Sequence, residues 1–259
     1  MRETYTIGVT ILRLSLALVA AVGAGAMNAI AGGGTLLTFP AIVALGVTPL
    51  VANVTSTVAL WPGSLGSMWA YRSEIVGARR WVIGFAAPSV GGGALGAWLL
   101  LHTDPASFAR IVPFLVLGAT ALFLVQRPLM RRMNASRVEA DGPSAGFLVA
   151  QFLVAVYGGY FGAGIGILML AVLGFMGFAN IHRMNGLKNW GAMCINGTAV
   201  VMFVAGGIVH WPIALTMATG GVMGGYVGAQ LAQRIGPERV RHAIVAIGLA
   251  AFVWLLYHQ

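Results

Sequence analysis

Charge and cysteine are both scarce in this chain. Charged residues make up 8% of its 259 residues, whereas an ordinary soluble domain has about a quarter of its residues charged. The single cysteine, Cys194, excludes an intrachain disulfide and a cysteine-ligated metal site, and no two histidines are spaced as metal ligands. We therefore expect no metal and no other cofactor, and the absence of any hydrolytic motif argues against an enzyme.

Long apolar runs take the place of the missing charge. Hydrophobic residues make up 59% of the chain, and runs of roughly 20 apolar residues recur, each long enough to cross about 30 Å of hydrocarbon. Many of the 37 glycines lie inside these runs, as in membrane helices, where small residues let backbones approach closely. The composition predicts an all-α polytopic protein of the lipid bilayer.

The sequence also repeats itself at an offset of 132 residues, without a gap. Two residues that are 132 positions apart are called offset partners. The pairs include Ala31 and Ala163, Asn53 and Asn185, Gly92 and Gly224, and Gly96 and Gly228. The GxxxG spacing of the last two pairs favours helix packing, either within one chain or in a homodimer. Membrane proteins built from two repeats commonly bind their ligand at the repeat interface.

Each copy contains five apolar segments. They lie at about 7–31, 35–46, 50–71, 81–101 and 108–126 in the first copy, and at about 145–163, 166–178, 186–208, 211–233 and 240–257 in the second. The second segment of each copy is too short for a full span and follows a glycine-rich run. We expect the first two segments of each copy to form a hairpin that turns or breaks within the membrane. A polar linker, 128–143, separates the N-terminal repeat, 1–127, from the C-terminal repeat, 144–259.

The basic residues are spread over short loops, so the net charge of +9 does not indicate nucleic-acid binding. Excess Lys and Arg mark cytoplasmic loops, which places the loop 72–80 and the linker 128–143 in the cytoplasm. With five segments in each copy, the two repeats then have opposite orientations, and both termini face outward. The sequence thus predicts two inverted-topology repeats.

No acidic residue lies within a predicted span. The six acids are Glu3, Glu74, Asp104, Glu139, Asp141 and Glu238, all in expected loops or tails. Carriers of cations usually need an intramembrane carboxylate as counter-charge. Its absence argues against a cation as the substrate.

One cation stands out, because Lys188 is the only lysine and begins the eighth apolar segment; its offset partner is Ser56. A cation within the bilayer costs roughly 2.5–3.5 kcal/mol on insertion scales and therefore tends to face a wet cavity and a partner. An anionic ligand is a natural partner here. The alternative is that Lys188 lies near the cytoplasmic edge and its amine reaches the interface.

Polar and glycine residues near Lys188 complete the candidate binding site. The side-chain donors are Asn28, Asn53, Thr55, Ser56, Asn185 and Asn189. They are suited either to anion oxygens near a helix N-terminus or to hydrogen bonds between helices. At the two glycine runs, Gly33, Gly34, Gly164 and Gly166 allow backbone amides to face an anion, with tight packing as the alternative. Tyr160 beside the second run is a ligand contact or a packing residue.

Two segments carry a family likeness. The first runs from Asn28 to Pro40 and continues through Ala52–Thr57, and the second comprises Tyr157–Gly166 and Asn185–Asn189. In this order and at this spacing, they resemble the TauE/SafE sulfite exporter family over nearly the whole chain. The resemblance implies a transporter of sulfur-containing anions, such as sulfite, sulfoacetate or taurine-related sulfonates, in a bacterial inner membrane.

The residues and the resemblance together predict a secondary transporter, and the resemblance implies export as the direction. Alternating access would come from one helix bundle moving against the other. The competing interpretation is an anion or small-solute channel built on the same inverted repeat. The expected partners are a small sulfur-containing anion and the bilayer.

Overall fold

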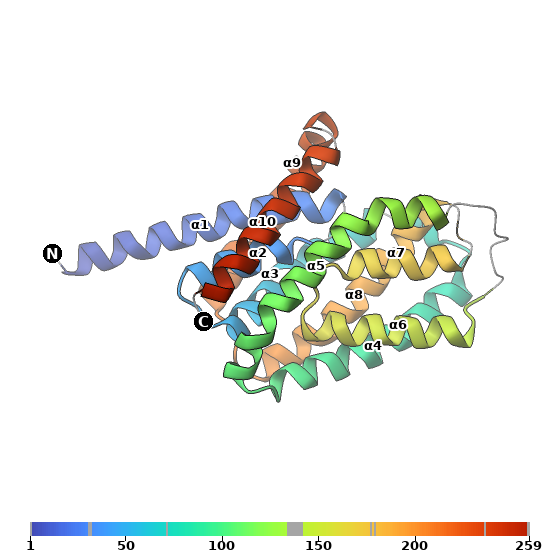
Figure 1. Cartoon of the computed structure of the whole chain (residues 1–259), viewed down its shortest axis with the longest axis horizontal. Coiled ribbons are helices and arrows are strands. Elements are labelled where there is room, and N and C mark those ends of the chain that lie inside the picture. The colour runs from blue at the N-terminus through green and yellow to red at the C-terminus, as the bar shows by residue number, and fades with distance from the viewer. Residues whose placement is uncertain are drawn as a thin grey trace.

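Helices form all the regular structure in the part of the chain that the computed structural model describes (Figure 1). The model describes every residue except 1, 31–32, 71, 134–141, 177, 179, 236 and 258–259. Its first half contains α1 (Arg2–Ile30), α2 (Thr35–Ala44), α3 (Pro49–Ala70), the short 3-10 helix η1 (Arg72–Ile75), α4 (Arg79–Leu101) and α5 (Pro105–Met133). Its second half contains α6 (Ala145–Tyr160), α7 (Ile165–Phe175), α8 (Ile181–Ala205), α9 (Trp211–Ile235) and α10 (Pro237–Tyr257).

The helices follow the segments predicted from the sequence, although several begin or end a few residues away from the expected bounds. The helices α2 and α7 are short and follow glycine-rich stretches, as predicted. Residues 128–133 continue α5, although we expected them to be linker. The helix α8 begins at Ile181, ahead of the expected start at 186, because the Asn180 side chain caps it by accepting hydrogen bonds from the next backbone amides.

The most extensive helix packing joins the two halves of the chain. The helix α1 packs along α9, and α4 packs along α6; Figure 1 shows α4 and α6 side by side. At the offset of 132 residues, α1 corresponds to α6 and α9 corresponds to α4. The two pairings are therefore the same contact with the halves exchanged.

Glycines set the distance between these helices. A Cβ atom on Gly92 or Gly96 would lie closer than 3.0 Å to backbone atoms of α6, and one on Gly224 would meet the backbone of α1. Gly92 lies against Phe152 and Gly96 against Val156, so α4 and α6 run parallel. The GxxxG face of α4 is thus used inside the chain, which removes it as evidence for a homodimer.

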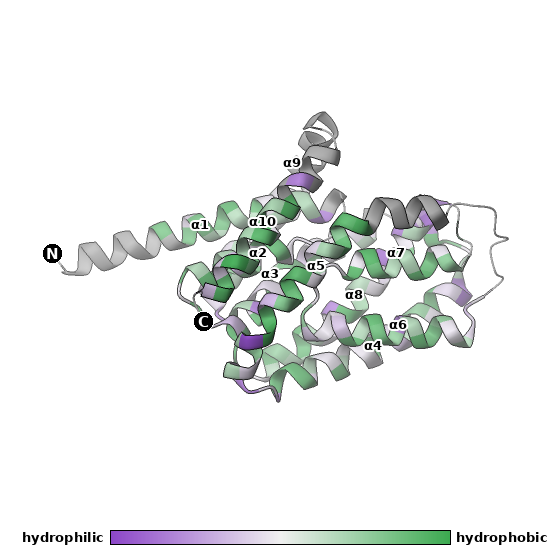
Figure 2. Ribbon diagram, viewed as in Figure 1, coloured by the Kyte–Doolittle hydropathy of each residue, from purple (hydrophilic) through white to green (hydrophobic). Residues whose placement is uncertain are grey.

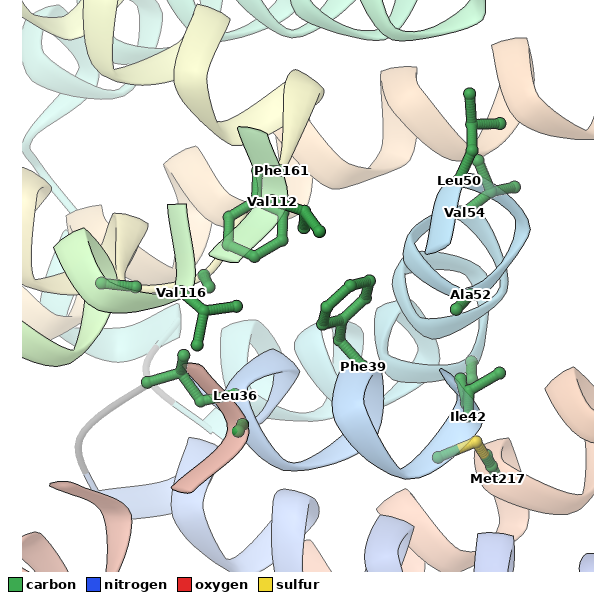
Figure 3. Close-up of a cluster of buried hydrophobic side chains, with 14 of the residues drawn as sticks. Leu36, Phe39, Ile42, Leu50, Ala52, Val54, Val112, Val116, Phe161 and Met217 are labelled. Carbon is green, nitrogen blue, oxygen red and sulfur yellow. The ribbon is translucent and has the colours of Figure 1, made fainter. Parts of the chain in front are cut away.

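A buried apolar cluster extends across both halves. Phe39 of α2 packs edge-on against Phe161 at the end of α6, with ring centroids 5.6 Å apart, and Val112 and Val116 of α5 lie in the same cluster (Figure 3). A second cluster places Trp81 of α4 between aromatic rings of the C-terminal half. Each half therefore completes the core of the other.

Apolar residues predominate along most of the helices (Figure 2), and many of their side chains are exposed. Phe114, Leu153 and Val201 are 61–70% exposed, although large apolar patches on a soluble monomer are rare. By length and hydropathy, two helices among the described residues qualify as membrane spans: α4 and the part of α5 from Pro105 to Val125. Together with several shorter apolar helices, they are consistent with a polytopic membrane protein.

The packing of α4 on α6 predicts different effects of two alanine substitutions on the stability of the protein. Gly96→Ala forces the helices apart and is expected to destabilise the protein by about 1–3 kcal/mol. Gly118 lies on the exposed face of α5, where a Cβ atom would meet nothing within 4 Å. Gly118→Ala is therefore expected to leave stability unchanged or to raise it by up to about 1 kcal/mol through helix propensity. Thermal unfolding in detergent measures both; equal midpoints for the two variants would contradict the packing described.

Candidate functional site

A cavity of about 520 Å³ lies between the two halves and is lined by α1, α2, α3, α7, α8 and α9. At roughly 30 Å³ per water molecule, this volume holds more than ten waters. Its polar lining includes Asn28, Thr57, Ser64, Lys188, Asn189 and Asn196. The cavity thus offers many hydrogen-bonding groups to a small polar ligand.

Among the described residues that line the cavity, Lys188 is the only one with a charged side chain. It lies about two turns into α8, and its side chain is only 7% exposed. No residue of the described chain accepts a hydrogen bond from its amine. A lysine that reaches the membrane surface would be far more exposed, so the burial favours the interpretation in which Lys188 faces a ligand.

The N-terminus of α7 faces the same cavity, through Ile165 and Gly166. Gly164 precedes the helix in the left-handed conformation, with φ of 80°, and no side chain caps the helix end. Within the described residues, the amide of Gly166 has no acceptor, and that of Ile165 makes only a long bond of 3.4 Å to the Gly162 carbonyl. Free amides and the helix dipole both favour an anion at such a position.

The N-terminus of α2 is arranged differently. The Asn28 side-chain oxygen accepts hydrogen bonds from the amides of Gly33 and Gly34, at 2.9 and 2.7 Å. We expected these two amides to be free for an anion, but they are bonded within the protein. The offset partner of Asn28 is Tyr160, whose hydroxyl instead lies 3.3 Å from the Thr103 hydroxyl.

Three predicted donors lie outside the cavity lining and connect helices instead. Asn53 donates to the Tyr160 carbonyl at 2.9 Å, Thr55 accepts from the His210 amide at 3.1 Å, and Ser56 bonds to Thr38. All three are buried, and these bonds satisfy polar groups inside the protein. The Asn53 side-chain oxygen, however, has no hydrogen-bond partner among the described residues. Asn185 and Gly164 are also absent from the lining. The cavity brings together Asn28, Gly33, Gly166, Lys188 and Asn189.

Several polar residues that line the cavity were not identified from the sequence. Ser64, Ser67, Thr57 and Asn196 line the cavity beside the predicted residues. Ser64 and Asn196 are offset partners, as are Thr57 and Asn189. Polar residues at both positions of an offset pair within apolar runs are the sequence feature that identifies Thr57, Ser64 and Asn196. Ser67 lacks this feature, because its offset partner is Ala199.

The cavity lies where α3 crosses α8. The Trp61 indole donates to the Met193 carbonyl at 3.4 Å, and these residues are offset partners. The bond from His210, just after α8, to Thr55, near the start of α3, brings opposite ends of the two helices together. The helices α3 and α8 are therefore antiparallel, with Trp61 and Met193 near the centre of the crossing.

The different settings of two asparagines predict different effects on stability. Asn53→Ala leaves the Tyr160 carbonyl without its donor and is expected to destabilise the protein by about 1–3 kcal/mol. Asn189→Ala, in the cavity wall, is expected to change stability by less than about 0.5 kcal/mol. Thermal unfolding of the two purified variants tests this difference, which would vanish if Asn53 were a free ligand contact.

Comparisons with known proteins relate the chain to membrane transporters. The family model described as sulfite exporter TauE/SafE matches residues 17–255. A probable membrane transporter protein of Haemophilus influenzae is 30% identical over 236 residues, covering 90% of each chain. The probable membrane transporter protein YfcA of Escherichia coli K12 is 29% identical, over 90% of this chain and 86% of its own. The probable membrane transporter protein ORF9 of a Sinorhizobium species is 30% identical, over 94% and 92%.

No solved structure matches the chain. The family model covers nearly the whole chain, and the matches to the relatives extend across both halves. The chain belongs to the TauE/SafE sulfite exporter family, which is a family of membrane transporters and not of enzymes.

Proposed function

We propose that this protein is a secondary transporter of small sulfur-containing anions, namely sulfite or organosulfonates such as sulfoacetate. One observation carries the proposal: buried Lys188 lines the cavity and has no partner among the residues that the structure describes. A buried charge without a counter-charge is costly, so such a group needs an anion to pair with. The name of the family agrees with a sulfur oxyanion.

The cavity favours an anion with a small organic group. Its volume exceeds what a single sulfite ion fills, and Leu60, Ile165 and Val222 add apolar surface to its polar lining. Pockets for small molecules commonly combine apolar walls with a few placed polar groups. This combination supports organosulfonates within the proposed substrate class.

We further propose that the two halves are inverted-topology repeats. The exchanged pairings of α1 with α9 and α4 with α6, the contact between Trp61 and its offset partner Met193, and the antiparallel crossing of α3 and α8 all fit a two-fold axis across these helices. An axis of that kind turns one repeat upside down relative to the other. The proposed topology has a cytoplasmic linker and both termini outside.

Alternating access is supported by a difference between the cavity and its offset positions. The cavity wall contains Gly63 and Ser67, whereas their offset partners Ile195 and Ala199 are fully buried. Gly25 in the wall corresponds to Tyr157, which donates to the Ala163 carbonyl at 2.7 Å. We propose that the cavity opens on the side of Ser67 and is closed on the side of Ala199. In the proposed topology the open side is cytoplasmic.

A binding panel tests the proposed substrate. We expect purified protein to bind at least one of sulfite, thiosulfate, sulfoacetate or taurine, with sulfate as a comparison. Lys188→Ala is expected to weaken the best anion at least tenfold, because charge-assisted bonds contribute about 1.5–3 kcal/mol. Lys188→Arg keeps the charge and should retain more affinity. If a folded, monodisperse Lys188→Ala protein binds as tightly as the wild type, the site assignment is wrong.

Labelling of single cysteines tests the one-sided opening. In a Cys194→Ala background, Ser67→Cys is expected to react with a membrane-impermeant thiol reagent from the cytoplasmic side, while its matched control Ala199→Cys is protected. Substrate binding should change the two rates in opposite directions as the protein alternates. Simultaneous reaction at both positions, from opposite sides, would instead indicate an open channel.

A further inference from the structure

The two short helices α2 and α7 each begin with backbone amides near the cavity, but within the described residues only the α2 amides have a side-chain acceptor. At α2, the amides of Gly33 and Gly34 both donate to the Asn28 side-chain oxygen. This oxygen sits where an oxygen of a bound anion would sit at a helix N-terminus. The amides of Gly33 and Gly34 are therefore already satisfied within the protein.

At α7, the corresponding amides belong to Ile165 and Gly166, and no side chain takes the place of Asn28. Tyr160, which stands at that position in the second half, packs its ring on Phe108 with centroids 5.8 Å apart. Its hydroxyl lies near Thr103. Among the described residues, nothing accepts a hydrogen bond from the Gly166 amide.

The positive charge lies on the same side of this asymmetry. Lys188, buried and without a partner in the described structure, lines the cavity together with Gly166. Its offset partner Ser56 is fully buried and bonded to Thr38. At α2, therefore, the Gly34 amide is bonded and no cation stands at the position that corresponds to Lys188. The helix end that lacks an occupant is thus the one that has the lysine.

We propose that the anionic group of the substrate binds at the N-terminus of α7, between the Gly166 amide and Lys188, and that Asn28 fills the equivalent α2 site as a permanent substitute for an anion oxygen. This inference rests on the proposed function. The ligand chemistry is a small oxyanion group, such as a sulfonate or sulfite. Asn28 is then a specificity-determining residue, because it restricts the chain to one anion bound away from the two-fold axis.

Substitutions at Asn28 test the proposal with a matched pair. Asn28→Asp keeps the acceptor for both α2 amides but adds a negative charge to the cavity, whereas Asn28→Ala removes the acceptor without adding charge. The tethered carboxylate repels a bound anion and competes for Lys188. Titration with sulfite and with sulfoacetate is therefore expected to show at least about tenfold weaker binding to Asn28→Asp than to Asn28→Ala.

Two results would overturn the proposal. Equal affinities of the two variants would show that the anion binds beyond the influence of residue 28. Binding to Asn28→Ala that is at least tenfold tighter than to the wild type would show that the anion prefers the freed α2 amides.

A backbone replacement tests the α7 amide directly. Glycolic acid introduced at position 166 by nonsense suppression replaces the N–H with an oxygen and leaves the side chains unchanged. We expect it to weaken binding of both probes about tenfold more than the same replacement at position 34, whose amide serves Asn28. The reverse order would place the anion at α2. Failure of the wild type to bind any probe would contradict the proposed function itself, whereas binding that is insensitive to position 166 would contradict only this inference.

Discussion

The structure depends on helix backbones that approach each other across the two halves of the chain. Where Gly92 and Gly96 of α4 lie against α6, a Cβ atom has no space, and Gly224 meets α1 in the same way. In hydrocarbon, water does not drive helices together, so close van der Waals contact is the main source of their association. This contact sets the positions of the helices between which the cavity lies, so that Lys188 and the α7 N-terminus line the same space.

The helices themselves were predictable because apolar length and glycine-rich breaks depend on local sequence. The short α2 and α7 and the five segments per half follow from this. The ends were harder: α8 begins early because Asn180 caps it, and α5 continues into a polar stretch because helical backbone does not require apolar residues. The sequence left two positions open for Lys188, because an isolated cation in a span either faces a polar cavity or reaches the interface. Its neighbours in the cavity were not predictable.

The side-chain roles near the cavity depend on partners distant in the sequence. Asn53, Thr55 and Ser56 were plausible ligands because they are polar and close to the aligned Asn residues. Their partners Tyr160, His210 and Thr38 become visible only in the folded chain. In the same way, the sequence suggested that both glycine runs offer free amides, and only the fold brings the Asn28 oxygen onto one of them. Duplication made the halves similar, and divergence at a few positions made the cavity asymmetric.

The pairing of α1 with α9 has a consequence for biogenesis. The main packing partner of the first helix is made only after most of the chain has been synthesised. Until then, the small residues of α1 face lipid, translocation machinery or other helices in temporary contacts. Contacts between segments so distant in the sequence form slowly and leave intermediates exposed. Assembly of this protein is therefore completed late in translation, when α9 and then α10 join helices of the first half.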